Sequence, residues 1–250
     1  MTRLSIALGQ KLAAFLSMRR PISGQSPPTP TERLRECLLP GDVVLVEGDT
    51  RVSVAIKYLT QSTWSHAALF VGDYRAGRLK SDDHCFVEAD LIDGVRSVGF
   101  EAFEDAHTRI CRPVSLTEQD RKQLTDFAIG RIGHQYDLRN VVDLARYLLP
   151  TPPVPTRWRR RMIALGSGDP TRAICSTLIA QAFQSIGYPI LPIVESKAMA
   201  RDDCLDCFEE IFHIRHHSLF APRDFDVSPY FRIIKPTIES GFDHRSIRWG

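Results

Sequence analysis

Residues 169–183 read DPTRAICSTLIAQAF, and this stretch decides how the rest of the chain is interpreted. Its apolar residues recur on one helical face and a glycine follows the last of them, which predicts a helix beginning near Cys175 (Leu178, Ile179, Ala182, Phe183 and Gly187). A helix N-terminus favours the thiolate through its unpaired N–H groups and positive dipole end. Cys175 is therefore a candidate nucleophile, the alternative being a cysteine that merely packs in the core.

The run WSHAALFVG at residues 64–72 lies about a hundred residues upstream and predicts a buried strand that His66 enters. An imidazole is the kind of base that a nucleophilic thiol needs. The alternative is a hydrogen-bonded core histidine without a chemical role. His66 is the candidate base.

A second short apolar strand is expected at residues 84–90, HCFVEAD, and its stretch FVEAD places Glu88 inside it. An ionised carboxylate is costly there unless it is paired. If the two strands are antiparallel neighbours, Glu88 can reach one nitrogen of His66 and leave the other nitrogen for the thiol proton. Asp90 competes for this role, and an edge-strand acid facing solvent is the alternative for Glu88.

The other elements predict one α+β domain with a small antiparallel sheet. Strands are expected at 43–46 and 94–98, with a final one at 229–234, and their tight spacing favours antiparallel pairing. Helices are expected at 51–61, after an N-cap at Thr117, and at 138–149. We expect residues 1–20 to form an amphipathic helix, residues 21–31 a Pro-rich linker and residues 32–250 the domain itself.

Composition restricts the class of protein. The 250 residues carry 32 basic and 30 acidic side chains, so net charge gives no reason to expect nucleic acid. Six dispersed cysteines without a recognisable secretion signal favour a reducing, cytoplasmic setting. The helix at 1–20 fits either a membrane surface or a terminal helix packed on its own domain.

In their order and spacing, these motifs resemble the permuted branch of the NlpC-type papain-like superfamily, the YiiX/YebB-like proteins. In this branch the cysteine helix follows the histidine strand. The matching segments cover roughly residues 38–235: LLPGDVVLV, WSHAALFVG, FVEA followed by GV, GHQYD, AICSTLIAQAF and APRDFDVSPYFRIIK. The resemblance implies a circularly permuted papain-like fold, a small antiparallel sheet or barrel flanked by helices.

The resemblance also implies a cysteine-dependent hydrolase or acyltransferase, with Cys175 as nucleophile, His66 as base and Glu88 as third member. The substrate would be a small-molecule, peptide or lipid amide or ester, and neither metal nor organic cofactor is required. Gly133 and Tyr136-Asp137 match the family's G-x-x-Y-D element near the cleft. The alternative is a catalytically inactive lipid- or peptide-binding protein of the same fold, or a membrane-surface adaptor.

Two further patterns carry alternatives. Cys204 and Cys207 precede His213, His216 and His217, but the gap of five residues between Cys207 and His213 is shorter than zinc fingers use, which favours a helix with exposed histidines over a metal site. The arginines around Trp158, within residues 157–161, suit phosphates of lipid headgroups or nucleic acid, and a solvated loop is the default interpretation.

Overall fold

A computed structural model describes most of the globular part of the chain. The described residues are 15, 18–19, 27–72, 83–90, 93–135, 174–198, 208–239, 241–246 and 248. Within these ranges, no helix is long and apolar enough to cross a membrane. The expected helix at 138–149 and the arginine segment 157–161 lie outside the described residues, as does most of the expected N-terminal helix.

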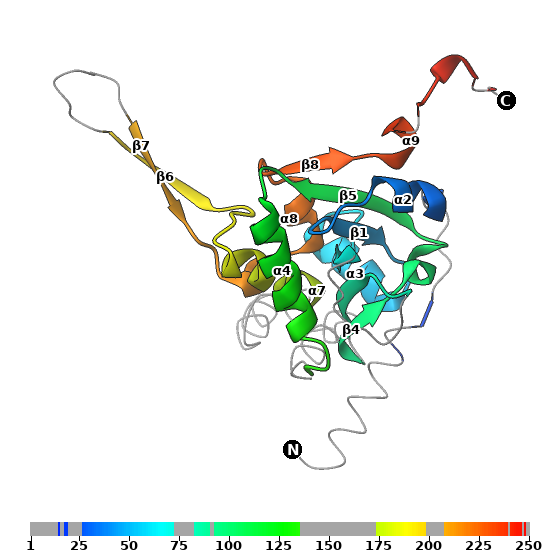
Figure 1. Cartoon of the computed structure of the whole chain (residues 1–250), viewed down its shortest axis with the longest axis horizontal. Helices are drawn as coiled ribbons and strands as arrows, with labels where there is room; N and C mark the ends of the chain where they lie inside the picture. Colours follow the sequence, from blue (N-terminus) through cyan, green and yellow to red (C-terminus); the bar gives the residue numbers. More distant parts are fainter. Residues whose placement is uncertain are drawn as a thin grey trace, which may run out of the picture.

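The centre of the molecule is a six-stranded antiparallel sheet in the order β4-β3-β2-β1-β5-β8 (Figure 1). Along the chain, α3 lies between β1 and β2, residues 71–85 lie between β2 and β3, and residues 91–93 lie between β3 and β4. The strand bounds are β1 Val43–Glu47, β2 His66–Phe70, β3 Phe86–Asp90, β4 Gly94–Val98, β5 His107–Pro113 and β8 Phe231–Ile234.

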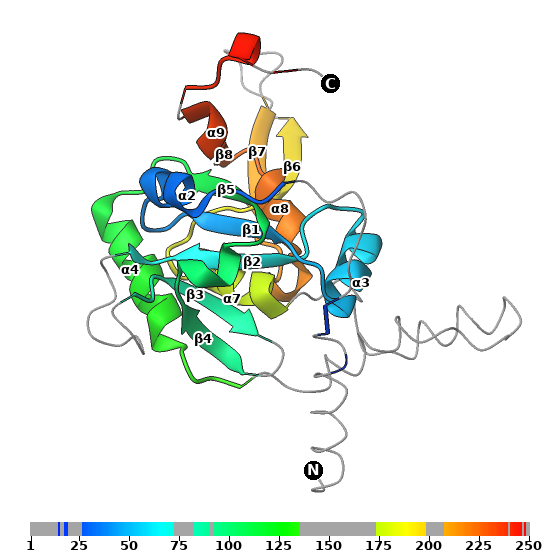
Figure 2. The same ribbon diagram turned by 90° about the vertical axis from the view of Figure 1, so that its right-hand side faces the viewer.

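Helices cover both faces of this sheet, as the two views of the ribbon show (Figures 1 and 2). On one face, α4 (Glu118–Gly130), α7 (Ile174–Ser185) and α8 (Pro222–Asp226) enclose the larger core with alternate residues of β1, β2 and β3. On the other face, α2 (Thr31–Cys37) and the 3-10 helix η2 (Phe100–Phe103) enclose the smaller core. The sheet is therefore buried on both sides, which explains its continuous apolar strands.

Helix starts follow the local sequence. Thr117 caps α4 by accepting the N–H of Asp120, whose carboxylate accepts the N–H of Thr117 in return. Thr50 caps α3 (Arg51–Thr60) in the same way through the N–H of Ser53. The predicted start of α4 and the predicted helix at 51–61 are thus confirmed.

A second, two-stranded sheet projects away from the domain (Figure 1). It pairs β6 (Ile193–Ala198) with β7 (Phe208–His213) in antiparallel register. The expectation of a helix around residues 204–217 is wrong, because the described part of that range begins as β7. The remaining short elements are η3 (His217–Leu219), α9 (Pro236–Glu239) and η4 (His244–Ser246).

The predicted fold class, mixed helices with a small antiparallel sheet, is confirmed. Of the two forms expected, the sheet is open, since β4 and β8 are its two edges. Of the predicted linker, residues 27–30 have no regular structure and α2 begins at Thr31.

Candidate active site

The three residues selected from the sequence come from three different elements. His66 is the first residue of β2, Glu88 lies in the middle of β3, and Cys175 is the second residue of α7. β2 and β3 are antiparallel neighbours with Ala68 opposite Glu88, and α7 packs on both strands. The fold thereby brings the start of β2, β3 and the first turn of α7 together.

His66 and Glu88 form a close pair. The Nε2–H of His66 donates to Oε2 of Glu88 at 2.8 Å. The Glu88 side chain keeps only 5% of its surface exposed, whereas the His66 side chain keeps 28%. A buried carboxylate needs such partners, so Glu88 is held on the sheet and does not face solvent.

Cys175 lies on the other side of His66. Its sulfur is hydrogen-bonded to the His66 side chain and accepts the backbone N–H of Ala67, and the Ser176 hydroxyl lies 3.9 Å from it. Cys175 and Ser176 are both buried. Because Nε2 of His66 is bonded to Glu88, Nδ1 is the ring nitrogen that remains for the thiol.

The charges of the three groups support one another. Burial alone would raise the pKa of Cys175, but the imidazolium of His66 and hydrogen bonds from His66, Ala67 and Ser176 lower it below its ordinary value. Burial alone would lower the pKa of His66, but the thiolate of Cys175 and the carboxylate of Glu88 raise it well above its ordinary value. The geometry thus favours a thiolate–imidazolium pair over two neutral groups.

Glu88 stays ionised in its buried position. Burial would raise its pKa, but the charge and hydrogen bond of His66, followed by those of Arg96, lower the pKa to about 2. An ionised Glu88 can only accept hydrogen bonds, which fixes the tautomer of neutral His66 with its proton on Nε2.

Sequence reasoning missed Arg96. It lies on β4 directly opposite Glu88, and its Nε–H donates to Oε1 of Glu88 at 2.9 Å. Asp90, the alternative third member, contacts Arg96 at 3.6 Å and accepts the N–H of Asp93. A lone arginine in the short strand GVRSV gives no signal before the register of β3 and β4 is known.

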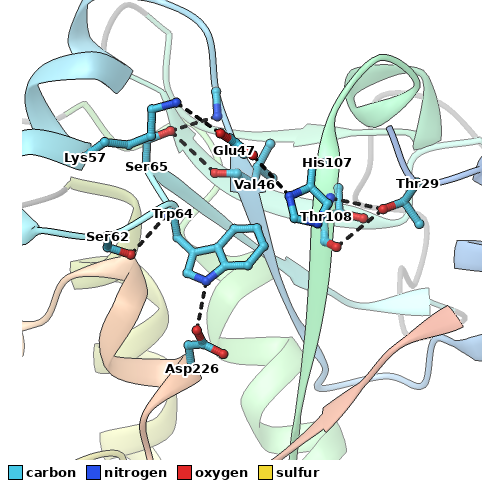
Figure 3. A network of polar contacts seen from close by, with 11 residues as sticks. Thr29, Val46, Glu47, Lys57, Ser62, Trp64, Ser65, His107, Thr108 and Asp226 are labelled. Carbon is cyan, nitrogen blue, oxygen red and sulfur yellow. Dashed lines mark hydrogen bonds and ion pairs between the residues drawn. The ribbon is translucent and has the colours of Figure 1, made fainter. Parts of the chain in front are cut away.

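Hydrogen bonds anchor Trp64 and Ser65, the two residues that lead into His66 (Figure 3). The buried indole of Trp64 donates its Nε1–H to Oδ2 of Asp226 at 3.0 Å. Ser65 donates its N–H to the carbonyl of Val46, and its Oγ accepts the N–H of Gly48 at 2.9 Å. The position of His66 at the start of β2 is therefore fixed from both the sheet and α8.

The G-x-x-Y-D element lies against β4. Gly133 donates its N–H to the carbonyl of Val95 at 2.8 Å, and Val95 donates to the carbonyl of His134 at 3.0 Å. Gly133 thus extends the edge of the sheet beside Arg96, while Tyr136 and Asp137 lie outside the described residues.

The two further patterns from the sequence lie largely outside the described residues. Cys204, Cys207 and the arginine segment 157–161 lie outside them. His213 pairs with Glu195 across the projecting hairpin at 3.1 Å. Among the described residues, no group of three or more His, Cys, Asp or Glu side chains is arranged to hold a metal ion.

Comparisons with known proteins give one family match and a similar solved structure. Residues 38–147 match a family described as permuted papain-like amidase enzymes, YaeF/YiiX, of the C92 family. The match includes His66 and Glu88 and ends before Cys175. A solved structure described as the metalloprotein YiiX from Escherichia coli O157:H7 is similar, with 13% identity over 78% of this chain and 95% of that one and a TM-score of 0.44. No curated protein matches the sequence.

Proposed function

We propose that this chain, whose residues 38–147 match the permuted papain-like amidase family, is a cysteine-dependent hydrolase that cleaves an amide or ester bond through a thioester intermediate. One observation carries the proposal. Cys175, His66 and Glu88 are connected in series by hydrogen bonds, from the start of α7 to the middle of β3. This is the arrangement of a nucleophile, a base and a residue that orients the base.

The first half of the reaction forms the thioester. His66 takes the proton of Cys175 on Nδ1, and the thiolate attacks the substrate carbonyl. Backbone N–H groups at the start of α7 then stabilise the oxyanion. The imidazolium of His66 gives its proton to the departing amine or alcohol as the carbon–heteroatom bond breaks, which leaves the acyl group on Sγ.

The second half releases the acyl group. His66, again neutral, takes a proton from a water molecule, and the resulting hydroxide attacks the thioester. The carbon–sulfur bond breaks, the acid leaves and Cys175 returns as a thiolate beside imidazolium. An alcohol or amine in place of water would make the same site an acyltransferase.

Acyl-enzyme trapping tests the proposal. The protein is mixed with p-nitrophenyl acetate, and its intact mass and digested peptides are measured over time. We expect a burst of p-nitrophenolate and one acetyl group on Cys175, with neither in Cys175→Ser. His66→Ala should slow acylation by about 10²- to 10⁴-fold, the range of general acid–base catalysis.

Cys37→Ser is the matched control. Cys37 is partly exposed, and burial together with the nearby carboxylates of Glu239 and Glu36 raises its pKa, so it should contribute nothing to the burst. Equal acetylation of Cys37 and Cys175, or no acetylation of Cys175, contradicts the proposal. Stable acetyl-Cys175 that water does not release contradicts a hydrolase and favours acyl transfer or the inactive binding protein.

A further inference from the structure

Arg96 binds one carboxylate oxygen of Glu88, and His66 binds the other. The Nε–H and an Nη2–H of Arg96 both reach Oε1 of Glu88 at 2.9 Å. His66 uses the other oxygen, Oε2. Two donors of one planar guanidinium therefore converge on Oε1 while His66 binds Oε2, so both oxygens of the carboxylate are held.

The guanidinium of Arg96 is itself fixed. Its Nη1–H donates to Oδ2 of Asp93 at 2.6 Å, and its Nη2 lies 3.6 Å from Oδ2 of Asp90. The Arg96 side chain is 35% exposed, compared with 5% for Glu88. Arg96 therefore connects a buried carboxylate with two acids at the rim of the sheet.

The backbone that carries Arg96 is held on both sides. β3 pairs with β4 along its whole length, and the loop at 133–134 bonds both backbone groups of Val95, the preceding residue. Both the backbone of β4 and the guanidinium of Arg96 are therefore held in place. A residue that positions another side chain must itself be fixed in this way.

The charges have a consequence for the thiol. The carboxylates of Glu88, Asp90 and Asp93 surround one guanidinium, so the cluster as a whole favours a positive charge on His66. Arg96 offsets part of this negative charge beside His66, and thereby limits its repulsion of the thiolate that His66 contacts. Removing Arg96 would have two effects at once: the cluster would become more negative, and Glu88 would lose the donors that hold its Oε1.

We propose that Arg96 is a positioning residue of the hydrolase. It holds the carboxylate of Glu88 in contact with His66 and thereby stabilises the thiolate form of Cys175. This proposal rests on the proposed function, since it assigns Arg96 to the same site. Arg96 touches neither the sulfur nor the substrate in this scheme and acts only through Glu88 and its charge.

The test is a pH titration of the Cys175 thiolate by its ultraviolet absorbance, taken as the difference from Cys175→Ser in each background. Arg96→Gln should move thiolate formation to higher pH by roughly one unit, because it removes a cation and the two donors that hold Oε1 of Glu88. Arg96→Lys keeps the charge but lacks the planar fork, so it should move the titration in the same direction by a smaller amount. Arg96→Lys is also the variant to measure if Arg96→Gln does not fold.

The matched control is Arg232→Gln, an exposed arginine on β8 at the opposite edge of the sheet, which should leave the titration unchanged. An equal shift in Arg232→Gln would show a general charge effect and overturn the proposal. The proposal is also overturned if the pH of thiolate formation in Arg96→Gln equals that of the natural protein. If only Arg96→Lys folds, the same comparison is made with Arg96→Lys. If Cys175 titrates as an ordinary thiol in the natural protein, the proposed function itself fails, which is a separate result.

Discussion

The Nε2 atom of His66 lies 2.8 Å from Oε2 of Glu88, and the pair spans two neighbouring strands of a sheet that is covered on both faces. Glu88→Gln removes the negative charge while keeping the size of the side chain. We expect the pKa of His66 to fall, because the carboxylate is one of the two charges that raise it. Nuclear magnetic resonance of the imidazole C–H protons measures this directly.

A second histidine–carboxylate pair on the same sheet serves as the control. Glu47 on β1 lies 3.1 Å from His107 on β5 (Figure 3), and Glu47→Gln should leave the titration of His66 unchanged. A His66 pKa that is the same in natural protein and Glu88→Gln would show that the contact has no electrostatic effect on the imidazole.

Glu88 also links stability to pH. Its pKa is about 2 in the folded chain and near its ordinary value of 4.5 when unfolded, so its contribution is present above pH 4.5 and lost as pH falls through 2. The shift corresponds to about 3 kcal/mol. The difference in unfolding free energy between natural protein and Glu88→Gln, from urea denaturation, should shrink by about that amount from pH 5 to pH 2. A difference that stays constant with pH contradicts the shifted pKa.

Much of the sheet could be predicted from sequence because its strands combine apolar runs with turn residues. β1, β2, β3 and β4 are short and largely buried, and their order along the chain is also their order across the sheet from β1 to β4. The pairing of β2 with β3 followed from the spacing of the strands along the chain. The contact between His66 and Glu88 depended on these two strands being neighbours, a condition that the sheet order meets.

The strand β5 was missed because its sequence, HTRICRP, contains two arginines. In the structure, each arginine meets an aspartate that is distant in sequence: Arg109 binds Asp226, and Arg112 binds the fully buried Asp42. Partners 117 and 70 residues away cannot be recognised by local periodicity. Arg96 was missed for the same reason, since its contact with Glu88 depends on strand register.

Gly94, the first residue of β4, tests how the edge of the sheet is built. Its φ is +73°, and a Cβ placed there would come within 2.4 Å of the carbonyl oxygen of His134. Gly94→Ala should therefore lower the unfolding free energy by about 1–3 kcal/mol, through backbone strain and the displaced loop. Thermal and urea denaturation measure the change.

Gly130 at the end of α4 is the matched control for Gly94, because a Cβ at Gly130 meets no atom within 4 Å. Gly130→Ala should be neutral or slightly stabilising, since alanine suits a helix better than glycine. If both substitutions have the same effect, the close approach of His134 to β4 does not constrain the edge.

Asp226 joins α8 to the segment that precedes His66. Its carboxylate accepts the Nε1–H of Trp64 at 3.0 Å and the Nη1–H of Arg109 at 2.7 and 2.9 Å, and the guanidinium of Arg109 lies 4.9 Å above the Trp64 ring. Asp226→Ala leaves the buried indole N–H without this acceptor. We expect the unfolding free energy to fall by about 2–3 kcal/mol.

The exposed ion pair between Lys122 and Asp126 on α4 provides the comparison, since Asp126→Ala removes a carboxylate whose partner remains in water. That change should stay within about 0.5 kcal/mol. Double-mutant cycles that combine Trp64→Phe with Asp226→Ala separate the indole contact from the arginine contact. A coupling energy near zero, or equal effects of Asp226→Ala and Asp126→Ala, would mean that Asp226 does not anchor Trp64, and the start of β2 would then depend on Ser65 and the sheet alone.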